Sequence, residues 1–124
     1  MEIGKVGELK DQIRLAIGVH GMWKTRINSA AQTGMSEWKP ELVESSHNCD
    51  FGKWLDSFPE AGKDAAFKKV FSIHADFHKE AARVLKMALN GHRVDAEKAM
   101  AIGGVYDTLT TSLTRAMMEW RDKP

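Results

Sequence analysis

The sequence contains a single cysteine, Cys49, among its 124 residues. One cysteine cannot form a disulfide within the chain. This excludes the small secreted folds that are held by disulfides, and it favours a reducing, cytoplasmic environment. No stretch approaches the roughly 18 apolar residues that a membrane-spanning helix needs. The first ten residues carry charged side chains and glycines before any apolar run, a composition that does not fit a secretory signal.

The sequence also lacks an excess of charge of either sign. Its 18 Lys and Arg residues and 17 Asp and Glu residues give a formal net charge of +1. Without a basic run, nothing indicates binding to nucleic acid or contact with a membrane surface. Hydrophobic residues make up 43% of the chain and charged residues 28%, which is typical of a globular protein. The length fits one domain over residues 1–124.

Apolar residues recur with helical spacing along most of the chain, and no alternating strand pattern is present. The spacing predicts long helices over about residues 5–32, 67–88 and 96–120, the last one weakened by Gly103 and Gly104 inside it. Asn90 and Gly91 are a suitable end for the middle helix. Long helices joined by short connections predict an all-α four-helix bundle.

Two shorter helices are expected between residues 32 and 67. Pro40 suits the first position of a helix of one or two turns. A short helix holding Cys49 through Leu55 is expected next, with Ser46 or Asn48 as its N-cap. The predicted bundle therefore has an additional short helix that carries Cys49.

Three histidines occupy positions in the apolar stripes of the predicted long helices. His20 lies in the stripe of the first helix, and His74 and His78 lie one turn apart in the stripe of the middle helix. Two histidines four residues apart share a helix face and can point at one ion. Unpaired buried imidazoles would each cost about 1–3 kcal/mol in desolvation, whereas neutral imidazole is a common metal ligand. Any one of them alone is more often a hydrogen-bonded core residue.

Cys49 supplies a fourth ligand of the kind that zinc prefers. Zinc binds four Cys and His side chains in tetrahedral geometry. A cysteine near a helix N-terminus is expected to have a lowered pKa and to form the thiolate readily, although a lone cysteine is most often a small buried hydrophobe. A carboxylate or backbone carbonyl is expected beside the ligands. Other residues are expected in the core (Trp23, Phe51, Trp54 and Phe77) or exposed to solvent (His47 and His92).

Three short blocks of sequence contain these candidate ligands. They read His-x-x-Trp from His20, Cys-x-Phe-Gly-x-Trp from Cys49, and His-x-x-x-His from His74. This combination resembles the chemoreceptor zinc-binding domain family, whose pattern has the same blocks at comparable spacings. The resemblance implies a four-helix bundle that forms homodimers and holds Zn²⁺ through His20, Cys49, His74 and His78. It also implies four supporting positions, which are Trp23, Phe51, Gly52 and Trp54. Among these, Gly52 is expected to let the Cys49 helix pack closely against a neighbour.

The resemblance implies a regulatory role and not an enzymatic one. Domains of the family occur on bacterial chemoreceptors, on diguanylate cyclases and as free-standing proteins. Zinc restrains the cyclases, and the zinc-bound cysteine of the chemoreceptors is linked to the sensing of oxidants. We therefore expect a sensor of zinc or of an oxidant, acting through the Cys49 thiolate. The sensor would control a chemoreceptor or a diguanylate cyclase, either in the same chain or as a partner protein. The output would be chemotaxis or cyclic-di-GMP synthesis.

Two other functions fit a helical metal-binding bundle. In the first, zinc only stabilises a structural dimerisation module. In the second, the bundle is a di-iron enzyme or oxygen carrier, which requires Glu-x-x-His motifs on two paired helices. The chain has no such pair of motifs. Four protein ligands also leave no open position on the metal for a substrate, so the di-iron function is disfavoured.

Overall fold

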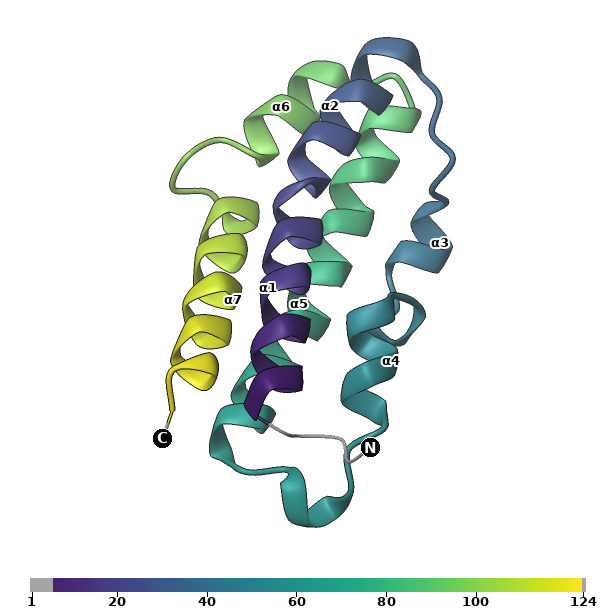
Figure 1. The fold of residues 1–124 in the computed structure, drawn as a ribbon. Helices are drawn as coiled ribbons and strands as arrows, with labels where there is room; N and C mark the ends of the chain where they lie inside the picture. The colour runs from purple at the N-terminus through teal and green to yellow at the C-terminus, as the bar shows by residue number, and fades with distance from the viewer. Residues whose placement is uncertain (1–5, 124) are drawn as a thin grey trace.

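The computed structural model describes residues 6–123, which form an all-α bundle with no strand in that range (Figure 1). This confirms the predicted fold class. The long helices are α1 (Val6–Gly21), α2 (Trp23–Thr33), α5 (Ala65–Leu89) and α7 (Val105–Arg121). Shorter elements lie in the connections: α3 (Pro40–Val43), η1 (Ser46–Asn48), α4 (Asp50–Asp56), η2 (Glu60–Gly62) and α6 (Arg93–Ala99).

The predicted continuous helix over residues 5–32 is wrong, because it is divided at Met22 into α1 and α2. Residue 5 lies outside the described residues. At the break, the Met22 amide donates to the Val19 carbonyl over 3.1 Å, a turn tighter than an α-helix. Gly21 precedes the break, and a glycine costs about 1 kcal/mol relative to alanine in a helix. The His20 ring also bonds the Ala16 carbonyl, which competes with the regular helical hydrogen bonds.

The prediction of one helix over residues 96–120 is also wrong. The chain forms α6 and α7 with a break between Ala99 and Val105. Gly103 has a φ of +87°, a left-handed conformation that L side chains rarely adopt and that interrupts an α-helix. The paired glycines that weakened the prediction are therefore part of the connection, and not part of the helix.

The predicted middle helix is confirmed as α5, which has 25 residues and begins two residues before Phe67. Asp64 caps its first turn by accepting a hydrogen bond from the Phe67 amide over 2.9 Å. Just past its end, Gly91 has a φ of +83°. The one-turn helix predicted at Pro40 is confirmed as α3, with the proline in the first turn.

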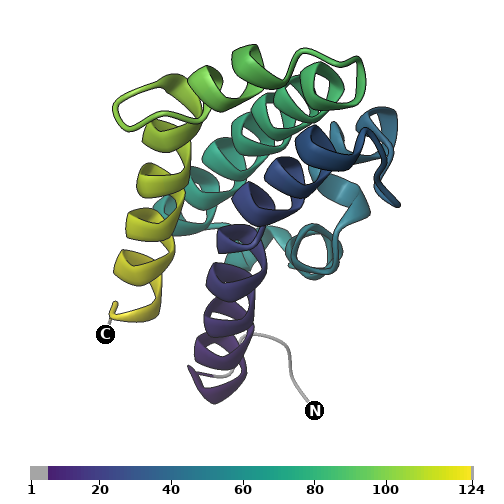
Figure 2. The ribbon, with the colours of Figure 1, turned by 90° about the horizontal axis from the view of Figure 1, so that it is seen from above.

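Helix α5 lies at the centre of the bundle and packs against α2, α3, α6 and α7, while α1 packs against α7. Seen from above, α1 and α7 lie side by side, and α2 runs along α5 at an angle to α1 (Figure 2). The largest fully buried apolar side chains come from all the long helices, from α4 and from the end of α6: Ile13, Ile27, Leu55, Phe77, Leu85, Met100, Leu113 and Met117. This core fixes α5 and the residues that project from it.

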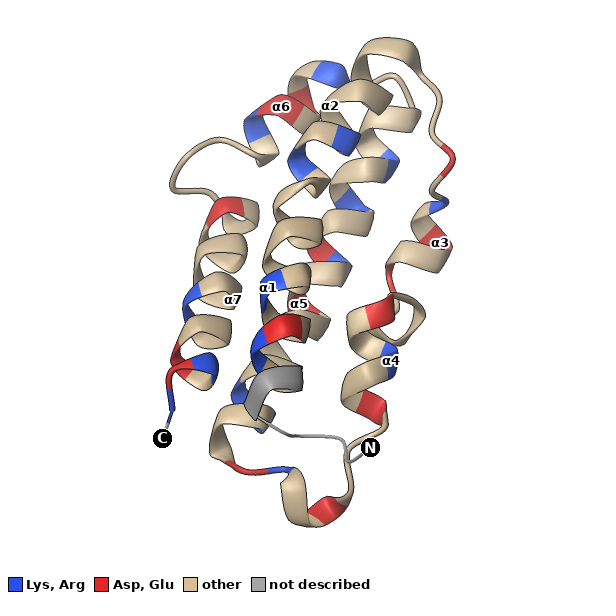
Figure 3. Ribbon diagram, in the orientation of Figure 1, with Lys and Arg blue, Asp and Glu red and all other residues tan. Residues whose placement is uncertain are grey.

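Charged residues of both signs are distributed over the helices (Figure 3). Several form ion pairs between neighbouring elements, such as Lys69 with Glu119 between α5 and α7. Within the described part of the chain, no helix is both long and apolar enough to cross a membrane.

Candidate metal centre

Cys49 lies at the start of α4 and is itself the N-cap of this helix. Its backbone is extended, with a φ of −87° and a ψ of 160°, and its Sγ accepts a hydrogen bond from the Gly52 amide over 3.3 Å. The predicted caps were therefore wrong. Ser46 belongs to the preceding turn η1, and the Asn48 side chain donates to the Leu42 carbonyl over 2.8 Å. One sulfur thus both caps α4 and faces the bundle.

Gly52 allows α4 to lie directly against η1. A Cβ atom on this residue would lie 1.7 Å from the carbonyl oxygen of Ser46, far inside van der Waals contact. Only glycine is compatible with this backbone arrangement. The expectation that Gly52 permits close packing of the Cys49 helix is confirmed.

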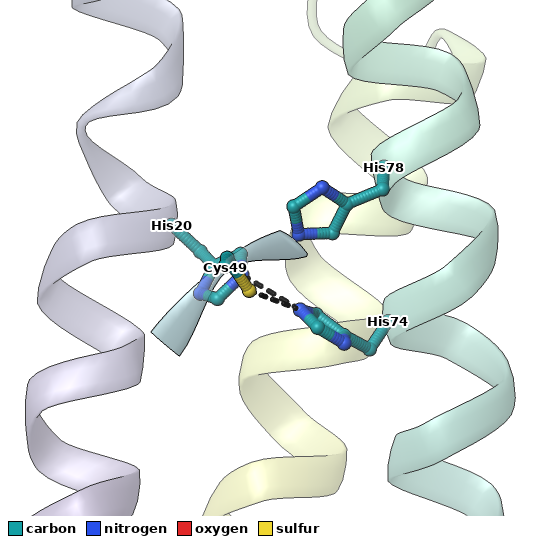
Figure 4. Close-up of side chains that lie close together, drawn as sticks. All are labelled: His20, Cys49, His74 and His78. Carbon is teal, nitrogen blue, oxygen red and sulfur yellow. Dashed lines mark hydrogen bonds between the residues drawn. The ribbon is translucent and has the colours of Figure 1, made fainter. Parts of the chain in front are cut away.

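The structure brings the four predicted site residues together at one point inside the bundle (Figure 4). His20 comes from the last turn of α1, His74 and His78 come from the middle of α5, and Cys49 comes from the start of α4. The three histidines are buried and Cys49 is partly buried. One ligand atom from each residue lies within 4.8 Å of the others.

The spacing of these atoms fits a tetrahedral zinc ion. Zinc bonds of about 2.0–2.1 Å to nitrogen and about 2.3 Å to sulfur place two donor atoms roughly 3.3–3.6 Å apart. His74 Nε2 lies 3.0 Å from His20 Nε2 and 3.3 Å from Cys49 Sγ. These two separations are already close to tetrahedral values, and the donor set of three His and one Cys is one that zinc prefers.

Backbone carbonyls orient two of the imidazoles. His20 Nδ1 donates to the Ala16 carbonyl over 2.7 Å, and His78 Nδ1 donates to the Val43 carbonyl over 2.8 Å. With its proton on Nδ1, each ring presents the lone pair of Nε2 to the cluster. His78 Nε2 is buried and has no hydrogen-bond partner among the described residues. A bound cation would satisfy this nitrogen. The hydrogen bonds of His20 and His78 to backbone carbonyls confirm the carbonyl partners that were expected beside the site.

His74 differs from the other two histidines. Its Nε2 points at the cluster, but its Nδ1 is buried without a hydrogen-bond partner in the described chain. Its ring is packed edge-on against Phe51, with 5.2 Å between the ring centroids. Packing within the aromatic core therefore orients His74, whereas hydrogen bonds orient His20 and His78.

Burial keeps the histidines of the cluster neutral. Desolvation lowers the pKa of His20 to about 4, where Arg26 and His78 add to the shift and the Ala16 hydrogen bond opposes it. Desolvation, with the neighbouring histidines, lowers the pKa of His74 to about 2. It also lowers the pKa of His78 against the opposing Val43 hydrogen bond. Neutral imidazole is the form that binds metal.

The predicted lowering of the Cys49 pKa is wrong for the metal-free protein. Burial raises the pKa of this thiol, and it outweighs the hydrogen bonds from the Gly52 and Phe51 amides that act in the opposite direction. Cys49 is therefore a thiol until a metal ion displaces its proton. The helix N-terminus supplies hydrogen bonds to the sulfur but does not overcome its desolvation.

The remaining predicted positions are as expected. Trp23, Phe51 and Phe77 are buried, and Trp54 is partly buried with its ring stacked on Phe51 at 5.8 Å between centroids. His47 and His92 are exposed. His47 bonds Asp56 over 2.7 Å, and His92 lies 3.8 Å from Asp95.

Sequence reasoning missed a clamp beside the site. The guanidinium carbon of Arg26 lies 4.9 Å from the ring centroid of Trp23 and 4.2 Å from that of Trp38. The spacing of Trp23 and Arg26 by three residues on one helix could have suggested the first contact. Nothing in the sequence marks Trp38, which lies in the connection between α2 and α3, as the second partner.

Comparison with protein-family models matches residues 20–85 to the chemoreceptor zinc-binding domain. The match covers more than half of the chain and includes all four residues of the cluster. The chain belongs to the chemoreceptor zinc-binding domain family. Searches of curated proteins and of solved structures found no match. Zinc is the metal of this family, and it is the metal that the donor set of three His and one Cys fits.

Proposed function

We propose that this chemoreceptor zinc-binding domain is a regulatory module in which His20, Cys49, His74 and His78 hold one zinc ion. The observation that carries the proposal is the convergence of three imidazole Nε2 atoms and one sulfur within 4.8 Å. The unpartnered Nε2 of His78 adds support, because a buried lone pair without a partner is costly. Zinc would join α1, α4 and α5 at a single point.

Native mass spectrometry with elemental analysis tests the site. We expect one zinc per chain in the parent protein and weakened binding in Cys49→Ala. His92→Ala is the matched control, because it removes an exposed histidine from the turn before α6. It should leave zinc content unchanged. Absence of zinc would contradict the proposal. The presence of two irons per chain would also contradict it and would favour a di-iron protein.

Cys49 is the proposed point at which an oxidant acts. Its sulfur is partly buried, whereas the three histidines are enclosed. Reaction of the thiolate with hypochlorous acid transfers a hydroxyl group to sulfur, which loses two electrons, and chlorine leaves as chloride. The sulfenic acid is a poorer zinc ligand, and the same atom caps α4. If Cys49→Ser responded to zinc and to the oxidant as the parent does, the redox role would be wrong.

Membership of the family supports the proposed signalling role. The domain would act in the bacterial cytoplasm as a homodimer, without nucleic acid, and control a chemoreceptor or a diguanylate cyclase in the same chain or a partner. The exposed apolar residues Leu15, Val19 and Met22 on one face of α1 and the turn after it support dimer formation. Four protein ligands on the zinc leave no open position for catalysis, which supports a role other than that of an enzyme.

A structural role for zinc is the second candidate. It is favoured by the distribution of the proposed ligands over three separate elements, because such a site contributes its binding energy to folding. Circular dichroism and size-exclusion chromatography of the metal-free protein separate the two functions. Complete unfolding and loss of the dimer would favour the structural module, whereas a second ordered state would favour the regulatory one.

A further inference from the structure

A cavity of about 540 Å³ lies beside the proposed metal site and is lined by His20, Cys49 and His78. The rest of its wall comes from α2 and from the connection between α2 and α3, through Arg26 and Trp38 among others. This cavity extends from three of the four proposed ligands to the connection between α2 and α3. It is therefore a route by which an ion or a small reagent could reach them.

The outer wall of this cavity is held mainly by side chains. Residues 34–39 form no helix. Within this stretch the Trp38 amide bonds the Ser36 hydroxyl over 3.0 Å, and the Trp38 ring packs against the guanidinium of Arg26 at 4.2 Å. Arg26 also contacts the ring of Trp23, whose centroid lies 5.7 Å from that of the Trp38 ring. Arg26 thus contacts both tryptophan rings, and these two contacts, with the contact between the rings, form a clamp that holds the loop against α2.

A second cavity of about 480 Å³ also reaches the site, and it is lined by His20 and Cys49 but not by His78. Its walls are α1 and α4, through Leu15, Phe51 and Trp54. This second route runs between residues of two helices, α1 and α4. Opening the first route requires the Trp38 ring to leave both Arg26 and Trp23, and the segment that would move lies outside the helices on either side of it.

We infer that Arg26 and Trp38 form a gate that sets how fast zinc, and small reagents that react with the Cys49 thiol, reach the metal site. This inference rests on the proposed zinc ligands. The closed state excludes solvent from three enclosed histidines, and exchange occurs when the Trp38 ring leaves the guanidinium. Because both entry and exit use the opened state, the gate changes rates in both directions and leaves the zinc equilibrium constant unchanged.

The test is a stopped-flow measurement of zinc transfer from the loaded protein to excess pyridylazoresorcinol, whose absorbance reports captured zinc. Arg26→Ala and Trp38→Ala should each accelerate release by a factor between about twofold and about thirtyfold, the range that corresponds to one cation–π contact. Arg26→Lys and Trp38→Phe keep a cation and an aromatic face, so they should restore slow release. The dissociation constant, measured by competition, should not change in Arg26→Lys, Trp38→Ala or Trp38→Phe, which keep the positive charge near His20, whereas Arg26→Ala removes this charge and should tighten zinc binding.

Two matched controls separate the gate from other effects. Gln12→Ala alters a side chain that lines the second cavity and not the first, and Lys24→Ala removes an exposed positive charge from α2 outside the clamp. Both should release zinc at the parent rate. The inference is overturned if Arg26→Ala and Trp38→Ala leave release unchanged, if Gln12→Ala accelerates it, or if zinc affinity weakens by the same factor as release accelerates.

Alkylation of Cys49 by iodoacetamide in the metal-free protein gives a readout that does not depend on zinc. The gate predicts faster alkylation in Trp38→Ala than in the parent, with unchanged circular dichroism. Failure of the parent to bind zinc would disprove the proposed function, but it would leave this measurement intact. Equal alkylation rates in a protein that does bind zinc would overturn the gate alone.

Discussion

The two halves of the proposed metal site are built differently. His74 and His78 project from α5, a helix of 25 residues at the centre of the bundle, and both rings are enclosed. Cys49 stands between η1 and α4, elements of three and seven residues. The first half is fixed by the hydrophobic core, whereas the second is held by single hydrogen bonds and by the close contact at Gly52.

This difference assigns the two halves different tasks. The α5 half presents its nitrogen atoms whether or not a metal is bound, because the core determines where they lie. The Cys49 half has fewer interactions of its own, so metal binding contributes a larger share of its stability. The sulfur that we propose as the target of an oxidant thus lies on the half that is more easily released. A signal that removes the sulfur from the metal would loosen α4 and leave α5 in place.

Acid should destabilise the metal-free fold as a whole, through His74 in the α5 half and His20 in α1, and we expect this to be the largest effect. The pKa values of His20 and His74 in the metal-free fold are lowered to about 4 and about 2, from an ordinary value of 6.5. The unfolded chain binds protons below pH 6.5 while the folded chain does not, so stability is lost as the pH falls from 6.5 toward 4. The loss is about 1 kcal/mol per pH unit for each histidine.

Urea denaturation of the metal-free protein at several pH values measures this loss. In His20→Gln and His74→Gln the slope of stability against pH should be shallower than in the parent. A stability that does not depend on pH between 6.5 and 4 would show that the histidines are not enclosed as described.

Substitution of Gly52 should break the Cys49 half alone. In Gly52→Ala the new Cβ would meet the Ser46 carbonyl, so α4 must move away from η1. We expect a loss of about 2–4 kcal/mol in unfolding free energy, together with weaker zinc binding. Gly18→Ala is the matched control in α1, with nothing within 4 Å of its Cβ, and it should be neutral or stabilising by up to about 1 kcal/mol. Equal effects of the two substitutions would contradict the close contact.

Removal of zinc should sharpen the contrast between the halves. Hydrogen exchange followed by mass spectrometry should show protection falling by at least about tenfold in the α4 amides, or about 1.4 kcal/mol. The amides around Phe77 and Leu85 in α5 should change less, because the core covers them with or without metal. A uniform loss of protection along the chain would favour the purely structural role of zinc.

The smallest effect is expected from an ion pair on the surface of the fixed half. Lys69 and Glu119 join α5 to α7 over 3.1 Å, but both side chains are 59% exposed. Exposed pairs contribute little, so Lys69→Ala should lower the unfolding free energy by no more than about 0.5 kcal/mol, as measured in urea. A loss as large as that of Gly52→Ala would mean that the core does not fix α5.

The sequence predicted best those elements whose own residues determine them. The apolar stripe of α5, its Asp64 cap and Gly91 all lie within or beside the helix, so its bounds were predictable. The site residues were predictable because histidines at core positions need a partner, and because the spacing of the three blocks resembles one family. The predicted membership is confirmed by the family match.

The features that the sequence did not predict depend on contacts that hydrophobic periodicity does not reveal, most of them between distant segments. The break at Met22 accompanies a ring-to-backbone bond of His20 that no periodicity reveals. The raised pKa of Cys49 results from burial by neighbouring elements, which outweighs the local effect of the helix N-terminus. The Val43 carbonyl that orients His78 is 35 residues away along the chain, and a backbone acceptor leaves no mark in the sequence.

The division of the first helix at Met22 gives α1 the geometry of a lever. His20 lies two residues before the break, next to the pivot, and α1 extends from there over 16 residues to Val6. At 1.5 Å per residue this arm is about 24 Å long, so a rotation of about 10° at Met22 moves its far end by about 4 Å. If an adjustment of the His20 ring turned α1 about Met22, the displacement at Val6 would therefore be much larger than the displacement at the ring.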